Sequence, residues 1–169
     1  TVVIRFTEST LFDTALIWVE NNRFFQKESI KPLENIYNIE PASLPLKNPA
    51  FLTFSLNQKQ KSMSGLGIYK LNNKKDEWEF QNLQQKNFNK ITVELSNLGA
   101  VTLLQDTIPP EMVNIFPAQS KSYTSGEIHS IECILKDNLS GIEPTEEALK
   151  IILNGKKIFC AYQPVKNEL

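Results

Sequence analysis

The sequence predicts an all-β chain built from two modules. Apolar and polar residues alternate with a period of two along most of the 169 residues. Turn-forming residues separate these runs at intervals of about 8–12 residues, a pattern typical of sandwiches and barrels of antiparallel strands. Two adjacent prolines at 109–110 stand between one apolar run and the next alternating run, and they predict a junction between modules.

The alternation locates individual strands. The run 51–57, "FLTFSLN", places Leu52, Phe54 and Leu56 on one face and polar residues on the other. The runs "EWEFQ" and "ITVEL" follow the same rule. Each pattern predicts a strand with one buried face and one solvent-exposed face. Further strands are expected at "VVIRF", "ALIWVE", "LGIYKL", "AVTLL", "MVNIF", "HSIECILKD", "LKIIL" and "KIFCAY".

Polar segments between these runs predict the connections. Residues 72–77, "NNKKDE", indicate a hairpin loop, and residues 57–65, "NQKQKSMSG", indicate a longer polar loop. Asn154 and Gly155 predict a tight hairpin, because both residues readily take a positive φ. Helix signals are few, and residues 143–149, "EPTEEAL", predict one short helical turn.

The prolines predict where the first module ends. Pro109 and Pro110 cannot donate to a strand ladder, and Pro110 keeps Pro109 out of the α region. Asp106 is expected to be a turn residue that enters this junction. We therefore expect one module at 1–107 and a second at 108–169. The second has about four strands, so we expect that the chain was cut from a longer protein or that the first module completes the sheet of the second.

The charge balance excludes some partners. The chain carries 18 basic and 19 acidic residues, for a net charge of -1. Such a chain has no broad basic field for phosphate backbones or anionic lipid, and we expect it not to bind nucleic acid. It has no apolar run of about 18 residues, so no transmembrane segment is predicted.

The sequence predicts no catalytic residue, no metal ligand and no cofactor. A hydrolytic zinc centre needs several histidines or cysteines around one ion, and a serine triad needs a histidine. His129 is the one histidine and opens a predicted strand. A site built from two carboxylates, as in glycosidases, stays open as an alternative because sequence does not show their separation.

The segment 135–143, "LKDNLSGIE", allows two interpretations. Asp137, Asn138 and Ser140 offer side-chain oxygens, and Gly141 can take a positive φ. These residues predict a structural turn in which polar side chains cap the backbone. The alternative is a calcium loop, although the repeated carboxylates of such loops are missing.

The two cysteines allow two states. Cys133 is in phase with Ile131 and Leu135, and Cys160 is in phase with Ile158. Both thiols are expected to face a core. A disulfide between them and a pair of buried thiols both remain open.

Three aromatic residues also allow two interpretations. Trp18, Trp78 and Tyr69 lie on strand phases that predict burial in the core. The alternative is a sugar-stacking platform, which would need their rings exposed together.

Several motifs resemble a known family. They lie in "PASLPLKNPAFLTFSLN", "LGIYKLNNKKDEWEF" and "LGAVTLLQDTIPPEM". These stretches resemble the non-catalytic β-rich region that follows the peptidase domain in bacterial lysostaphin-type (LytM-like) zinc endopeptidases. The residues that carry the resemblance are Pro41, Pro45, Leu46, Leu66, Gly67, Ile68, Tyr69, Trp78, Leu98, Gly99, Leu103, Asp106, Thr107, Pro109 and Pro110.

The remaining part is similar to the immunoglobulin-like module that comes next in those proteins. The matching positions are a turn and a hairpin, namely Asp137, Ser140, Gly141 and Ile142, then Leu153, Asn154, Gly155 and Lys156. The resemblance implies two consecutive immunoglobulin-like β-sandwich modules, the second incomplete at its C-terminal end. The catalytic histidines and aspartate of the family have no counterpart here, so the segment itself is not expected to be an enzyme.

The resemblance also implies a role and a location. We expect non-catalytic accessory or spacer modules of an exported bacterial cell-envelope protein, associated with a peptidoglycan endopeptidase. The alternative is a carbohydrate- or peptidoglycan-binding module. The expected location is periplasmic, outer-membrane-associated or secreted. The expected partners are neighbouring domains of a larger chain and, for the alternative, cell-wall glycan or peptide.

Overall fold

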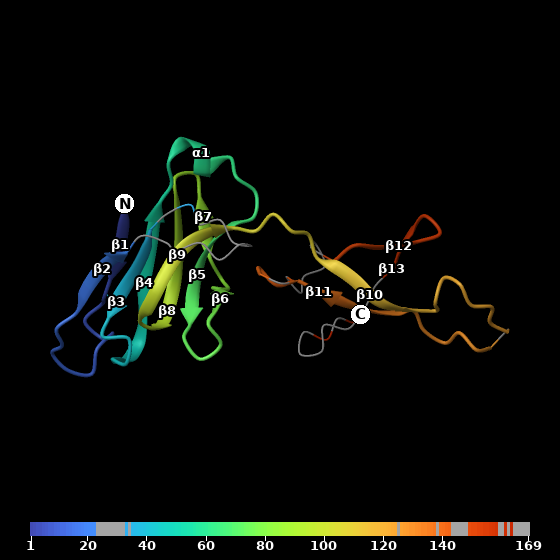
Figure 1. Cartoon of the computed structure of the whole chain (residues 1–169), viewed down its shortest axis with the longest axis horizontal. Coiled ribbons are helices and arrows are strands. Elements are labelled where there is room, and N and C mark those ends of the chain that lie inside the picture. Colours follow the sequence, from blue (N-terminus) through green and yellow to red (C-terminus); the bar gives the residue numbers. More distant parts are fainter. Residues whose placement is uncertain are drawn as a thin grey trace. The chain divides into compact units, whose positions relative to one another are not determined.

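The protein is all-β with antiparallel sheets (Figure 1). Its backbone contacts divide it into two compact units, Thr1–Thr107 (unit 1) and Ile108–Leu169 (unit 2). Unit 1 holds a four-stranded and a five-stranded sheet, and unit 2 holds two two-stranded sheets. The structure is a computed structural model, and it describes residues 1–22, 33, 35–124, 126–137, 139–142, 149–158, 161 and 163.

The four-stranded sheet of unit 1 centres on a long strand. The strands, in sheet order, are β1 (Val2–Arg5), β4 (Pro45–Ser55), β8 (Lys90–Asn97) and β7 (Gln85–Asn87). All neighbours are antiparallel. The register pairs Leu52 with Val93 and Phe54 with Ile91, so the apolar residues of β4 and β8 share one face.

The five-stranded sheet has β9 at its centre. Its strands, in order, are β2 (Trp18–Asn22), β3 (Ile36–Glu40), β9 (Gly99–Gln105), β5 (Leu66–Asn72) and β6 (Glu77–Phe80). All of its pairs are antiparallel as well. A one-turn helix, α1 (Gln58–Lys61), lies in the connection from β4 to β5.

The two sheets of unit 1 pack face to face around one core. Most of the core residues come from β4 and β8 on one side and from β3, β5 and β9 on the other, and Leu56 and Leu98 directly adjoin these strands. They form a single cluster of Ile39, Leu52, Phe54, Leu56, Leu66, Ile68, Ile91, Val93, Leu95, Leu98, Val101 and Leu103. The inward faces predicted for the runs 51–57 and 91–95 are thereby confirmed.

Unit 2 is built from hairpins. β10 (Glu111–Phe116) pairs with β11 (Glu132–Lys136), and the register shifts between Val113 and Phe116. β12 (Ile151–Leu153) pairs with β13 (Lys156–Ile158). Among the described residues of this unit, Leu135 is the one buried apolar side chain. The helical turn predicted at 143–149 lies, apart from Leu149, outside the described residues, as does much of the strand predicted at 157–162.

Three elements of unit 1 differ from the sequence prediction. Strands β3 and β7 were not predicted, and the loop predicted at 57–65 contains helix α1. A pair of reciprocal bonds explains the helix. The Asn57 side chain accepts from the Gln60 N–H at 2.9 Å, and the Gln60 side chain accepts from the Asn57 N–H at 2.9 Å. Within the described part of the chain, no helix has the length and apolar character needed to cross a membrane.

Candidate functional site

The connector between the units, residues 106–110, is hydrogen-bonded to unit 1 at its first residue. The N–H of Asp106 donates to the Gly65 carbonyl at 2.8 Å, and Gln105 Nε2 donates to the Ser64 carbonyl at 3.1 Å. These bonds prolong the β5–β9 pairing by one step. The last four residues of the connector are exposed, and β10 begins directly after them.

Gly65 makes this close approach sterically feasible. Its φ is +66°, which is in the left-handed region, and a Cβ built there would lie 2.0 Å from the Asp106 carbonyl oxygen. Real carbon and oxygen atoms do not approach so closely, so any other residue must displace the connector. The backbone of Asp106 therefore has a structural role at the junction.

Asp137 organises the turn that follows β11. Its Oδ1 accepts from the N–H of Leu139 at 2.9 Å and from the N–H of Gly141 at 2.8 Å. Gly141 has a φ of +73°. One carboxylate oxygen thus satisfies two backbone donors, which is the usual role of aspartate in a turn. Ser140 is half-buried in the same turn.

Asn154 and Gly155 form the turn between β12 and β13. Their φ angles are +50° and +78°, as the tight turn of a two-residue hairpin requires. The turn sets the β12–β13 register, in which Leu153 pairs with Lys156.

A groove in unit 2 contains His129 and Cys133. Its volume is about 890 Å³, and its apolar lining comes largely from isoleucines. His129 is exposed, and Cys133 is half-buried on β11. Cys160 lies outside the described residues, so the disulfide with Cys133 stays a prediction. Among the residues that the structure describes, no three His, Cys, Asp or Glu side chains gather closely enough to hold a metal ion.

The three aromatic residues do not share one exposed face. Tyr69 is fully buried and Trp78 is half-buried. Trp18 is 46% exposed, and its indole N–H donates to Glu20 Oε1 at 3.2 Å. Core burial was therefore the wrong prediction for Trp18. Its strand β2 and the strand of Trp78, β6, form opposite edges of the five-stranded sheet, about 19 Å apart at the usual strand spacing.

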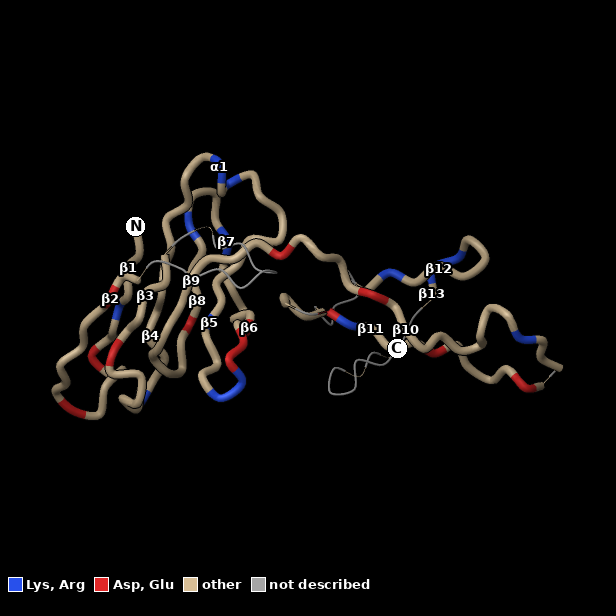
Figure 2. Tube along the Cα trace, in the orientation of Figure 1, with Lys and Arg blue, Asp and Glu red and all other residues tan. Residues whose placement is uncertain are grey.

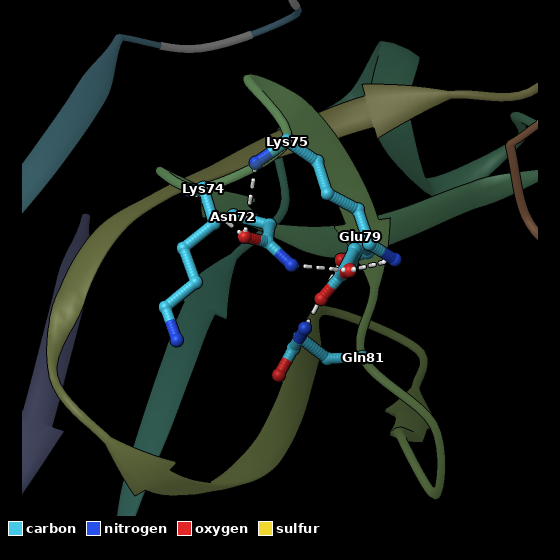
Figure 3. Close-up of polar contacts among 5 residues, drawn as sticks. All are labelled: Asn72, Lys74, Lys75, Glu79 and Gln81. Atoms are coloured by element: carbon cyan, nitrogen blue, oxygen red, sulfur yellow. Dashed lines mark hydrogen bonds and ion pairs between the residues drawn. The ribbon is translucent and has the colours of Figure 1, made fainter.

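A polar cluster closes the β5–β6 hairpin (Figure 3). Asn72 Oδ1 accepts from the N–H of Lys74 at 3.0 Å, and Asn72 Nδ2 donates to Glu79 Oε1 at 2.7 Å. Lys75 Nζ lies 3.4 Å from the same Glu79 oxygen. The hydrogen bond from Asn72 is the main cause that lowers the pKa of Glu79, and Lys75 adds to it. All these bonds lie within one hairpin, so the cluster stabilises the loop predicted at 72–77.

Gln84 performs a role that sequence reasoning missed. Its Oε1 accepts from the Ile68 N–H at 2.8 Å, and its Nε2 donates to the Ile68 carbonyl at 2.8 Å. Nε2 also donates to the Gln81 carbonyl at 2.6 Å. The side-chain amide thus replaces a paired strand residue beside β5 and satisfies both polar groups of a fully buried residue.

Replacing Gln84 with alanine should lower the free energy of unfolding of unit 1 by about 1–2 kcal/mol, because the buried N–H of Ile68 loses its partner, while the Ile68 carbonyl keeps the N–H of Gln81 at 3.0 Å. Urea unfolding followed by tryptophan emission measures this change, since Trp18 and Trp78 both lie in unit 1. Gln85→Ala is the matched control, because Gln85 is exposed on edge strand β7. Equal effects of the two substitutions would contradict the role given to Gln84.

Comparisons of the chain with protein-family models, with curated proteins and with solved structures found no match. The structure itself establishes a mostly β-strand protein with several antiparallel sheets. The family resemblance rests on the motif residues alone.

Proposed function

We propose that this chain is a pair of non-catalytic, immunoglobulin-like β-sandwich modules that space and orient neighbouring domains. The parent protein would be an exported bacterial cell-envelope protein associated with a peptidoglycan endopeptidase. The observation that carries the proposal is the connector. The two compact units meet at Thr107 and Ile108, directly before the Pro109-Pro110 pair.

The connector has the features of a stiff joint. Its first residue is bound to β5 through the backbone of Gly65. Its last two residues are prolines, whose rings fix φ and favour extended conformations. Only two residues, Thr107 and Ile108, separate these restraints. A short, restrained connection limits the directions in which the second unit can point, which is what a spacer needs.

The polar groups singled out in the sequence support a structural role rather than a binding role. Asp137 caps a turn and Asn154 forms a hairpin. A carbohydrate- or peptidoglycan-binding surface would need several aromatic rings exposed on one face. Trp18 and Trp78 lie on opposite edges of their sheet, which favours the spacer over that alternative.

Replacing Pro109 and Pro110 with glycine should uncouple the tumbling of the two units. In the unmodified chain we expect ¹⁵N relaxation to report closely similar correlation times for both. In the glycine variant the correlation time of the smaller unit 2 should fall by roughly twofold, because glycine linkers behave as flexible coils. The double alanine variant should lie between the two.

The comparison is valid only if units 1 and 2 both remain folded in the variants. Unchanged amide chemical shifts of β4 and β11 serve as that control, because neither strand adjoins the prolines in the chain. Two independent correlation times in the unmodified chain would contradict the stiff joint and with it the spacer proposal.

A further inference from the structure

One end of unit 1 gathers lysines around an exposed aromatic ring. Strand β4 ends at Ser55, which pairs with Lys90 at the start of β8. Helix α1 follows β4 at once and carries Lys59 and Lys61. The β7–β8 hairpin turns at the same end, because the N–H of Leu56 donates to the Asn89 carbonyl at 2.8 Å. Figure 2 shows blue segments gathered around α1 and β7.

Phe88 lies at the tip of this end. It is in the two-residue turn between Asn87 and Lys90, which pair with each other, and its side chain is 82% exposed. The Nζ atom of Lys61 lies 4.7 Å from the centre of its ring. The ring is thus held out from the sheet with a cation over one face.

The lysine patch consists of Phe88 with Lys59, Lys61, Lys86 and Lys90. Lys86 Nζ donates to the Met63 carbonyl at 3.1 Å, which places it on the side of α1. Lys59, Lys86 and Lys90 are exposed, and Lys61 is partly so. The four charges come from two stretches that are apart in the sequence, helix α1 and the β7–β8 hairpin. The net charge of the whole chain does not reveal this local gathering.

Acidic residues do not offset these lysines along the segments that form the patch. Neither 56–65 nor 81–92 contains an aspartate or a glutamate. Asp106, whose N–H donates to the Gly65 carbonyl, is an acidic residue at the end of the first of these segments. The overall charge of -1 therefore hides a local positive field at one end of unit 1.

We propose that the lysine patch docks unit 1 on an anionic lipid surface. Lysine ammonium groups bind anionic headgroups, and an exposed aromatic ring enters the boundary between headgroups and acyl chains. The lysine stems let the charges stay at the phosphates while the ring goes deeper. Phe88 favours lipid over a soluble polyanion, because a soluble polyanion would pair with the lysines and give the ring no apolar surroundings.

The test is binding of the full chain to vesicles. Sedimentation with vesicles of equal parts phosphatidylglycerol and phosphatidylcholine should show binding, and vesicles of phosphatidylcholine alone should show much less. Raising the ionic strength from about 0.1 M to about 1 M shortens the screening length from about 10 Å to about 3 Å, and it should release most of the protein.

Matched lysine variants locate the contact. Lys59→Gln with Lys90→Gln should weaken binding on the order of twentyfold, at about fivefold for each lysine. Lys47→Gln with Lys74→Gln removes the same charge from exposed positions elsewhere on unit 1 and should change binding less than threefold. Equal losses in the two pairs would overturn the proposal, because they would show an effect of net charge alone.

Variants at position 88 test the role of the ring. Phe88→Trp should add tryptophan emission that shifts to the blue when anionic vesicles are added, against the unchanged background of Trp18 and Trp78. Phe88→Ser should weaken vesicle binding, whereas Phe12→Ser, at another exposed phenylalanine, should not. Binding to a soluble polyphosphate or a DNA oligonucleotide that matches vesicle binding and is insensitive to Phe88→Ser would overturn the assignment to lipid.

Discussion

Replacing Phe54 with alanine should lower the free energy of unfolding of unit 1 by about 3–5 kcal/mol. Phe54 is 1% exposed and belongs to the cluster that both sheets share. Its ring meets Tyr37 edge-on, with centroids 5.7 Å apart, so the four-stranded and five-stranded sheets touch through this pair. Alanine would leave a cavity between the sheets that a strand framework cannot easily close.

Tryptophan emission during urea unfolding measures this loss, because both tryptophans lie in unit 1. Phe51→Ala is the matched control on the same strand. Phe51 is half-buried on the opposite face of β4, where the Arg5 guanidinium carbon lies 5.0 Å from its ring centre. The control should cost no more than about 1–2 kcal/mol. Similar losses for both phenylalanines would show that the sheets do not share a core.

The sequence predicts the burial of Phe54 because two-residue periodicity is a local property. The burial of Leu52, Phe54 and Leu56 can be predicted without knowing which strands pair with theirs. The same holds for Ile91 and its neighbours. Strand β3 was missed because its segment, 36–40, alternates weakly and ends in a glutamate. Trp18 was misplaced because phase alone does not tell an edge strand from a central one.

The helical turn α1 had a local signal that was overlooked. Asn57 and Gln60 have the spacing of a capping box, and the structure shows both of its bonds. Gln84 had no such signal, because its partner Ile68 is 16 residues away and glutamine fits many surroundings. The lysine patch could not be predicted from the sequence either, because its residues come together only when β4, β7 and β8 pair.

At the junction between the units, the addition of a single methyl group should destabilise unit 1. Gly65→Ala should lower the free energy of unfolding of unit 1 by about 2–3 kcal/mol. An alanine at a φ of +66° is strained, and its Cβ would collide with the Asp106 carbonyl oxygen, 2.0 Å away. The collision must break the 2.8 Å bond from the Asp106 N–H to the Gly65 carbonyl.

Leu83→Ala is the control for an alanine in a left-handed backbone that meets no collision. Leu83 has a φ of +58° and is 95% exposed, so alanine there keeps a left-handed backbone and loses no packing. Its effect should stay within about 0.5 kcal/mol. Hydrogen exchange completes the measurement, because the Asp106 amide should lose its protection in Gly65→Ala while the amides of β8 keep theirs. Retained protection at Asp106 would mean that the connector is not anchored through Gly65, and the joint would then be held by its prolines alone.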